Sequence, residues 1–184
     1  MPFSPFRSAA ADPDARVRAV EALLSEHERA LVRYAARLLG GDVERGRDAV
    51  QEAFLRLCRQ EDIGELGREW LFTVTRRICI DVQRKESRMT TIEDTDAVDA
   101  LGDAASAASA DEASGSIGSD DELLKALHHL PDRQQEAIRL KFESGLSYAE
   151  IAGVMGTSAG NVGWILHTAI QGLRSRLVPE GGAR

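Results

Sequence analysis

The chain has 184 residues, with 23 Lys and Arg against 30 Asp and Glu, and its formal net charge is −7 at pH 7. This average argues against a protein that binds nucleic acid, but the charge is unevenly distributed. Residues 1–89 hold 16 basic and 15 acidic residues, residues 90–122 hold none and 10, and residues 123–184 hold 7 and 5. The sequence therefore predicts two nearly neutral segments joined by an acidic one. The length of the whole chain fits one domain or two small ones.

Several classes of protein are excluded by the composition. A hydrophobic content of 43% is near that of globular proteins, and no apolar run approaches the roughly 18 to 20 residues that span a bilayer. The N-terminus has neither the basic nor the apolar region of a signal peptide, so we expect a cytoplasmic protein without membrane insertion. Cys58 and Cys79 lack a CxxC partner, and we interpret them as reduced, packed thiols.

Residues 90–119 are rich in Ala, Ser, Asp and Gly and contain no aromatic and no basic residue. Such a segment buries too little apolar surface to offset the entropy of ordering it. We therefore predict a flexible acidic linker, whose root-mean-square span would be on the order of 30 Å.

Three helical patterns precede this linker. The first begins at Asp12-Pro13 and stops at Gly40-Gly41, the second follows Asp42 as N-cap, and the third runs from about Arg68 to about Arg88. In each, apolar residues recur at spacings of three and four, as in helices with one buried face. These stripes are Leu24, Leu31, Ala35 and Leu38; Val50, Phe54 and Leu57; and Leu71, Val74, Ile78 and Val82. No segment alternates like a strand, so the first domain is predicted to be all-α.

Short helices are also predicted after the linker. Asp120 opens one through Leu123, Leu124 and Leu127, and Pro131 separates it from another that ends at Ser144-Gly145. Then Ser147 and Glu150 form a capping box for a helix that Gly156 closes. Thr157 or Ser158 caps the last helix, whose apolar stripe is Val162, Leu166, Ala169, Leu173 and Leu177. Two helices joined by a short turn with Gly match a helix-turn-helix, although short helix pairs are common in all-α domains.

The third helix is predominantly basic. Its cations are Arg76, Arg77, Arg84, Lys85 and Arg88, against Asp81 and Glu86, and Trp70 and Phe72 lie at its start. Cations bind phosphates and flat rings stack on unpaired bases, so this helix is a candidate for melted or single-stranded nucleic acid. The alternative is an ordinary solvated face on which Asp81 pairs with Arg77 and Lys85.

The polar face of the second helix, formed by Asp48, Gln51, Glu52 and Arg56, is by itself an ordinary solvent-facing surface. His27, His128, His129 and His167 are scattered, and neither an HExxH motif, a nucleophile elbow nor a phosphate-binding glycine loop is present. We expect no catalytic site, no metal site, no cofactor and no enzyme activity.

Together these segments resemble the extracytoplasmic-function (ECF) group of RNA polymerase sigma factors, in the sigma-70 superfamily. Residues 48–57 resemble the core-polymerase-binding motif, residues 70–85 the promoter-melting helix, and residues 130–177 the helix-turn-helix of region 4. The match spans about residues 20–88 and 120–178, and three motifs in this order around a polar linker are specific. The resemblance implies an all-α fold of two small helical domains, a region 2 three-helix bundle and a region 4 helix-turn-helix.

The resemblance also implies an organisation and a set of partners. Residues 1–19 would be an N-terminal extension, 20–89 the region 2 domain, 90–119 the linker, 120–178 the region 4 domain and 179–184 a tail. The partners would be core RNA polymerase, at its β′ clamp and β flap, and promoter DNA, with an anti-sigma factor as a further candidate. In this family the linker follows basic polymerase channels that later hold RNA, so we expect the acidic strip to mimic nucleic acid until the transcript displaces it.

Site residues follow from the same resemblance. Core polymerase would contact Asp48, Gln51, Glu52 and Phe54. The downstream promoter element would contact Trp70, Arg76, Arg77, Arg84, Lys85 and Arg88, with the Gln60–Arg68 loop receiving a flipped base. The upstream element would contact Ser158, Asn161, Trp164, His167, Thr168 and Arg174.

The last helix departs from the family, which commonly carries several cations after the position of Val162, whereas here none appears before Arg174. We therefore expect weak upstream binding, or binding that depends on Lys141, Arg174 and Arg176. Gly163 would allow DNA or a partner to approach the backbone closely. An alternative function is a sigma-like adaptor that binds polymerase or an anti-sigma factor while reading promoters poorly, with Trp164 and Ile165 as its apolar patch.

Overall fold

The computed structural model describes residues 13–60, 63, 66–93 and 119–177. Contacts divide the chain into two compact units, residues 1–111 and 112–184. The described residues form helices and turns and no strand, which confirms the predicted all-α class with two small helical domains. None of these helices combines the length and apolar character needed to cross a bilayer.

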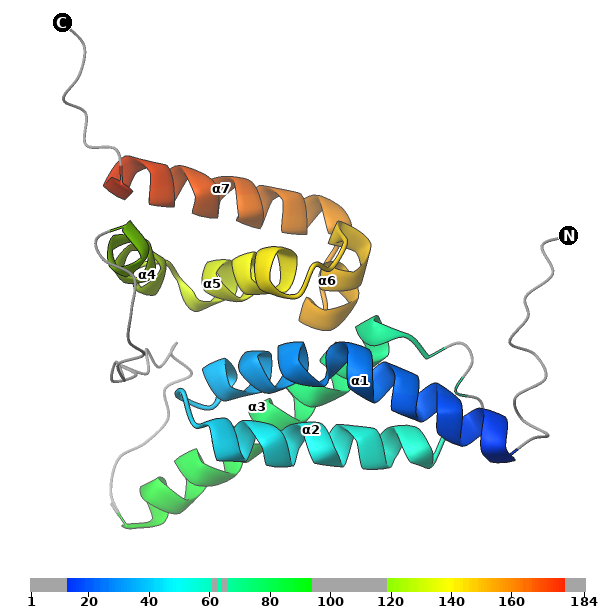
Figure 1. The fold of residues 1–184 in the computed structure, drawn as a ribbon. Coiled ribbons are helices and arrows are strands. Elements are labelled where there is room, and N and C mark those ends of the chain that lie inside the picture. The colour runs from blue at the N-terminus through cyan, green and yellow to red at the C-terminus, as the bar shows by residue number, and fades with distance from the viewer. Residues whose placement is uncertain (1–12, 61–62, 64–65, 94–118, 178–184) are drawn as a thin grey trace, which may run out of the picture. The chain divides into compact units, whose positions relative to one another are not determined.

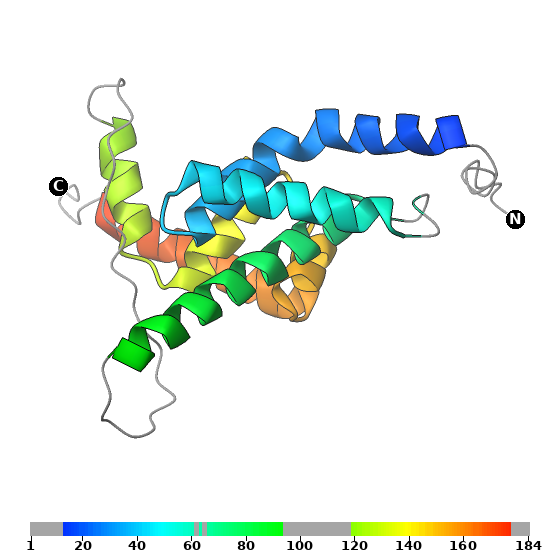
Figure 2. The same cartoon turned by 90° about the horizontal axis from the view of Figure 1, so that it is seen from below.

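The first unit is a bundle of three helices, α1 (Pro13–Leu38), α2 (Val43–Cys58) and α3 (Arg68–Glu93). The α1 and α2 helices run side by side in opposite directions, and α3 crosses and contacts both (Figures 1 and 2). The core lies among the second half of α1, the inner face of α2 and the first half of α3. Its most deeply buried side chains include Leu31, Ala35, Ala53, Leu57, Leu71 and Phe72.

The turns of this unit follow from local chemistry. Gly40 and Gly41 adopt positive φ angles of 74° and 93°, which end α1 and turn the chain toward α2. The predicted cap at Asp42 is confirmed, since its carboxylate accepts a hydrogen bond of 3.0 Å from the backbone nitrogen of Arg45. At the other end of α2, the Arg16 guanidinium donates to the carbonyl oxygens of Cys58 and Gln60 and so satisfies acceptors that the helix leaves free.

The second unit contains α4 (Ser119–His128), α5 (Asp132–Ile138), the π-helical turn η2 (Arg139–Glu143), α6 (Tyr148–Met155) and α7 (Ala159–Leu177). The long α7 helix packs against α4, α5 and α6 (Figure 1). Val162, Leu166 and Ala169 of its predicted stripe are buried, while Leu173 and Leu177 are half-buried.

The α6–α7 pair has the predicted helix-turn-helix geometry. Both hydrogen bonds of the capping box are present: Glu150 N donates to Ser147 Oγ at 3.3 Å, and Ser147 N donates to Glu150 Oε2 at 2.7 Å. Gly156 ends α6 in the left-handed conformation with φ of 63°. Of the two caps proposed for the last helix, Ser158 accepts the bond from the backbone of Asn161, at 3.2 Å.

Some details of the helices were predicted wrongly. The α3 helix continues to Glu93, so it enters the segment assigned to the linker, and residues 94–118 lie outside the described part. Leu123 and Leu124 of α4 are exposed, and Ala126 of that helix is buried instead. Leu24 of α1 is also outside the core, with 37% of its surface exposed.

Candidate functional surfaces

The α2 helix carries the predicted polar face toward solvent. Asp48 and Gln51 are exposed, and Glu52 is half-buried and forms an ion pair of 2.8 Å with Arg56 one turn later. Leu55, with 47% of its surface exposed, interrupts these polar side chains. The outer face of α2 is therefore mixed rather than fully polar, a composition that suits a protein interface.

Beside this face lies a groove of about 420 Å³ between α1 and α2. Gln51 and Phe54 line it, and so does the exposed Leu24. Phe54 is only 7% exposed, so it forms part of the groove wall rather than projecting from the surface. The full lining is Leu24, Glu28, Val32, Arg47, Val50, Gln51, Phe54, Leu55 and Cys58. The sequence analysis did not predict this groove. The lengths of the two helices were the available signal: α1 has 26 residues and α2 has 16, so α1 extends beyond the end of α2.

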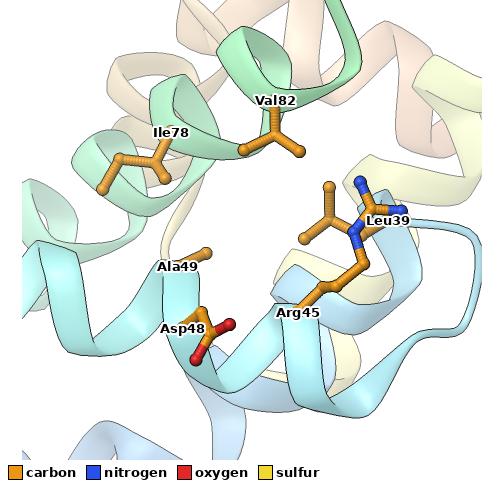
Figure 3. A pocket seen from close by; sticks show the side chains of 6 residues that line it. All are labelled: Leu39, Arg45, Asp48, Ala49, Ile78 and Val82. Carbon is orange, nitrogen blue, oxygen red and sulfur yellow. The ribbon is translucent and has the colours of Figure 1, made fainter. Parts of the chain in front are cut away.

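A second pocket, of about 240 Å³, lies between α2 and α3 and is shown in Figure 3. Leu39, Ala49, Ile78 and Val82 supply its apolar lining, and Arg45 and Asp48 of α2 its polar groups. Arg45 also forms an ion pair with Glu86 of α3, and this hydrogen bond raises the pKa of the guanidinium. The pair ties α3 to α2.

The α3 helix exposes four cations: Arg77, Arg84, Lys85 and Arg88. Glu86 points to Arg45, and no ion pair among the described residues joins Asp81 to Arg77 or Lys85. The alternative interpretation, local neutralisation by Asp81, is therefore not what the structure shows. Arg76 differs from the four because it is half-buried and interacts with another group.

The aromatic residues at the start of α3 have different surroundings. Trp70 is half-exposed and lies seven residues, about two turns, before Arg77, so it shares the face of the basic side chains. Phe72 is 1% exposed and packs against Tyr34 with ring centroids 5.4 Å apart, so it has no free face for a base. Part of the Gln60–Arg68 loop lies outside the described residues; within it, Ile63 is buried against the unit.

Three of the predicted upstream-element residues are engaged within α7 and its cap. Ser158 Oγ accepts from the Asn161 backbone, Asn161 Nδ2 donates to Thr157 Oγ1 at 2.7 Å, and Thr168 Oγ1 donates to the Trp164 carbonyl at 2.9 Å. By contrast, Trp164, His167 and Arg174 are exposed on the side of α7 away from the core.

The flank of α7 shows the surroundings of Gly163, Lys141 and Ile165. The ring of Tyr148 lies beside the half-buried Gly163, since a Cβ on that glycine would contact Tyr148 Cε2 at 3.7 Å. The Lys141 ammonium lies 5.3 Å from the centroid of the same ring and donates to the Leu146 carbonyl at 3.2 Å. Ile165 is 5% exposed, so it cannot form an apolar patch with Trp164.

Within the described residues, no cluster of His, Cys, Asp and Glu could hold a metal ion. Of the two cysteines, Cys58 is exposed and Cys79 is buried, and burial raises the pKa of the Cys79 thiol to about 12.

Comparison with known proteins matches both units to one family. Residues 23–89 match sigma-70 region 2, and residues 120–173 match sigma-70 region 4. The ECF RNA polymerase sigma factor SigL of Mycobacterium tuberculosis is 34% identical over 171 residues, covering 90% of this chain and 92% of that protein. The ECF RNA polymerase sigma factor EcfG of Rhodopseudomonas palustris is 30% identical over 146 residues, covering 78% and 77%. The sigma factor RpoE of Bartonella quintana, solved in complex with the anti-sigma factor NepR, aligns with a TM-score of 0.64 at 25% identity, covering 88% of this chain and 98% of that one.

Proposed function

The chain belongs to the ECF group of the sigma-70 family, and from that premise we propose which of its surfaces meets polymerase and which meets promoter DNA. As a member of this family it is a sigma factor, which binds core RNA polymerase and directs promoter-specific initiation. The alternative of an adaptor that reads promoters poorly is not favoured by these relatives. We further propose that the chain acts in the cytoplasm without catalytic activity of its own.

The separation of charge between α2 and α3 carries the assignment of surfaces. The exposed face of α2 presents Asp48 and Gln51 beside the exposed Leu55, whereas the four exposed cations of α3 are paired with no carboxylate among the described residues. A cationic face suits phosphates, and a mixed face beside an apolar groove suits a protein.

Core polymerase, through its β′ clamp, is therefore assigned to α2 and the neighbouring groove. Asp48, Gln51 and Glu52 supply polar contacts, and Leu24, Leu55 and the edge of Phe54 supply apolar area. Complementary charge around an apolar centre sets the orientation of such a contact.

The non-template strand of the downstream element is assigned to α3. Arg77, Arg84, Lys85 and Arg88 hold its phosphates, and Trp70, on the same face, offers a ring to an unstacked base. Arg76 is half-buried, and its role in binding the downstream element is proposed to be secondary to that of the four exposed cations.

The second unit is assigned to the upstream element and the β flap, with α7 in the major groove. Residues 20–89 and 120–178 are proposed as the two functional domains, and residues 90–119, of which the first four belong to α3, as the segment that joins them. An anti-sigma factor is a candidate partner of this chain, because the related RpoE was solved with one.

Two readouts test the assignment of surfaces: binding of the full chain to core polymerase, and promoter opening by the resulting holoenzyme. Asp48→Lys is expected to weaken polymerase binding at least tenfold, because it places a cation where the clamp meets a carboxylate. Glu26→Lys is the matched control, since Glu26 is an exposed carboxylate of α1 outside the groove lining. Equal losses in both variants would contradict the assignment of α2.

The double substitution Arg84→Ala and Lys85→Ala is expected to keep polymerase binding within twofold and to lower promoter opening at least tenfold. Unchanged opening would contradict the role of α3, and a loss of polymerase binding would move these cations to the protein interface.

A further inference from the structure

The outward side of α7 carries two exposed large apolar side chains, Trp164 and, further along the helix, Ile170, of which Trp164 is the more exposed. Trp164 has 64% of its surface exposed, while its neighbours Ile165 and Leu166 are buried at 5% and 2%. Exposed residues follow at spacings of three and four, namely His167, Gln171 and Arg174, so Trp164 begins the outward stripe of this helix. In the proposed binding mode that stripe meets the base edges of the upstream element.

The polar groups near Trp164 have limited capacity to read bases. Ser158 accepts the capping bond, Asn161 donates to Thr157, and Thr168 donates its hydroxyl proton to the Trp164 carbonyl. A hydroxyl or amide held in a local bond has fewer donors left for a base edge.

Charge is also scarce here. Residues 159–173 contain no Lys, Arg, Asp or Glu, and Lys141 is held against Tyr148 on the flank of α7. Bidentate contacts of Arg or Lys to guanine, the commonest specific contacts in the major groove, are therefore not available from the first four turns of this helix.

The C5-methyl of thymine is the apolar group that base pairs present in the major groove. We propose that Trp164 contacts the C5-methyl of a thymine in the upstream element, so that α7 selects thymine by an apolar contact in place of charged hydrogen bonds. This specificity rests on the proposed function, because it needs α7 to lie in the major groove.

The test removes the methyl group alone. A promoter library with a randomised upstream element is transcribed by the wild-type holoenzyme, and the selected thymines are replaced one at a time by deoxyuridine. At one position this change is expected to weaken promoter binding about fourfold, the factor that burying one methyl-sized group contributes. The measurement uses the unaltered protein, so it does not depend on a variant folding.

Variants then assign the effect to the indole. Trp164→Ala is expected to bind thymine and uracil promoters equally and to keep the polymerase affinity, and Trp164→Phe is expected to recover part of the preference. Phe142→Ala is the matched control, since Phe142 is 65% exposed but lies on η2, and it is expected to keep the full preference.

The possible failures are distinct. Selected promoters without an upstream thymine, or a uracil effect that persists in Trp164→Ala, would overturn the inference and leave the sigma-factor function intact. Loss of polymerase binding in Trp164→Ala, with no change in thymine preference, would assign the indole to a protein contact instead. A wild-type holoenzyme that never initiates would overturn the proposed function and the inference together.

Discussion

Gly46 of α2 packs directly on the backbone of Ala36 of α1: a Cβ on Gly46 would lie 2.8 Å from the Ala36 nitrogen and 3.1 Å from its Cα. Backbone atoms cannot rotate away, so a side chain at this position must push the helices apart. The close approach fixes the α1–α2 pair, which carries both walls of the groove assigned to polymerase.

Gly46→Ala is therefore expected to lower the free energy of unfolding of the first unit by about 1 to 3 kcal/mol, because overpacking outweighs the gain in helix propensity. Gly160→Ala is the matched control, since nothing lies within 4 Å of its Cβ position in α7. It is expected to stabilise the second unit by up to about 1 kcal/mol. Denaturant unfolding of the two variants measures both changes, and a stabilised Gly46→Ala would contradict the close packing.

The basic face of α3 predicts a defined salt dependence. Each cation that neutralises a phosphate of single-stranded DNA contributes about 0.7 to the slope of log K against log salt concentration. Arg84→Ala and Lys85→Ala are each expected to lower that slope by about this amount for the downstream strand. Arg29→Ala and Arg33→Ala, which remove exposed cations from α1, are the controls and should leave it unchanged. Equal slopes in all four variants would place the DNA elsewhere.

The two cysteines should differ in reactivity and in their effect on pH dependence. A thiol reagent should label Cys58 in the native protein and Cys79 only after unfolding, because Cys79 is buried. Its pKa is raised from 9.0 to about 12, so the unfolded state loses the proton first as pH rises. The free energy of unfolding should consequently fall between pH 9 and 12, by at most about 1.4 kcal/mol per pH unit. Cys79→Ala should remove this component of the slope; an identical slope in variant and wild type would show that Cys79 ionises freely.

The acidic linker remains a prediction of the sequence, because residues 94–118 lie outside the described part of the structure. Replacing Asp94, Asp96, Asp99 and Asp103 by Asn should weaken holoenzyme assembly, most clearly at low salt, where charges are least screened. Titration of labelled core polymerase at two salt concentrations measures the effect. An affinity that does not change at either concentration counts against mimicry of nucleic acid by this segment.

Local signals allowed much of the fold to be predicted. The caps at Asp42 and Ser147, the Gly40-Gly41 turn and the Gly156 end of α6 depend on one or two neighbouring residues, and the structure has them where the sequence indicated. Periodicity also identified most of the buried stripe residues, namely Leu71, Val74 and Ile78 of α3 and Val162, Leu166 and Ala169 of α7.

Features that depend on a second helix were not predictable. Phe72 looked available for stacking, but Tyr34 of α1 covers it. Nothing along α3 indicated that Glu86 pairs with Arg45 of α2. Gly163 looked open along α7, but the ring of Tyr148 from α6 lies beside it. Each outcome is set by the crossing of two helices, which spacing along one helix does not encode.

Run-off transcription with purified core polymerase on a promoter library tests the central claim most directly. The full chain is predicted to form a holoenzyme that initiates at a defined subset of the library sharing an upstream and a downstream element. Stable polymerase binding without initiation from any sequence would contradict the claim that this chain directs promoter-specific transcription.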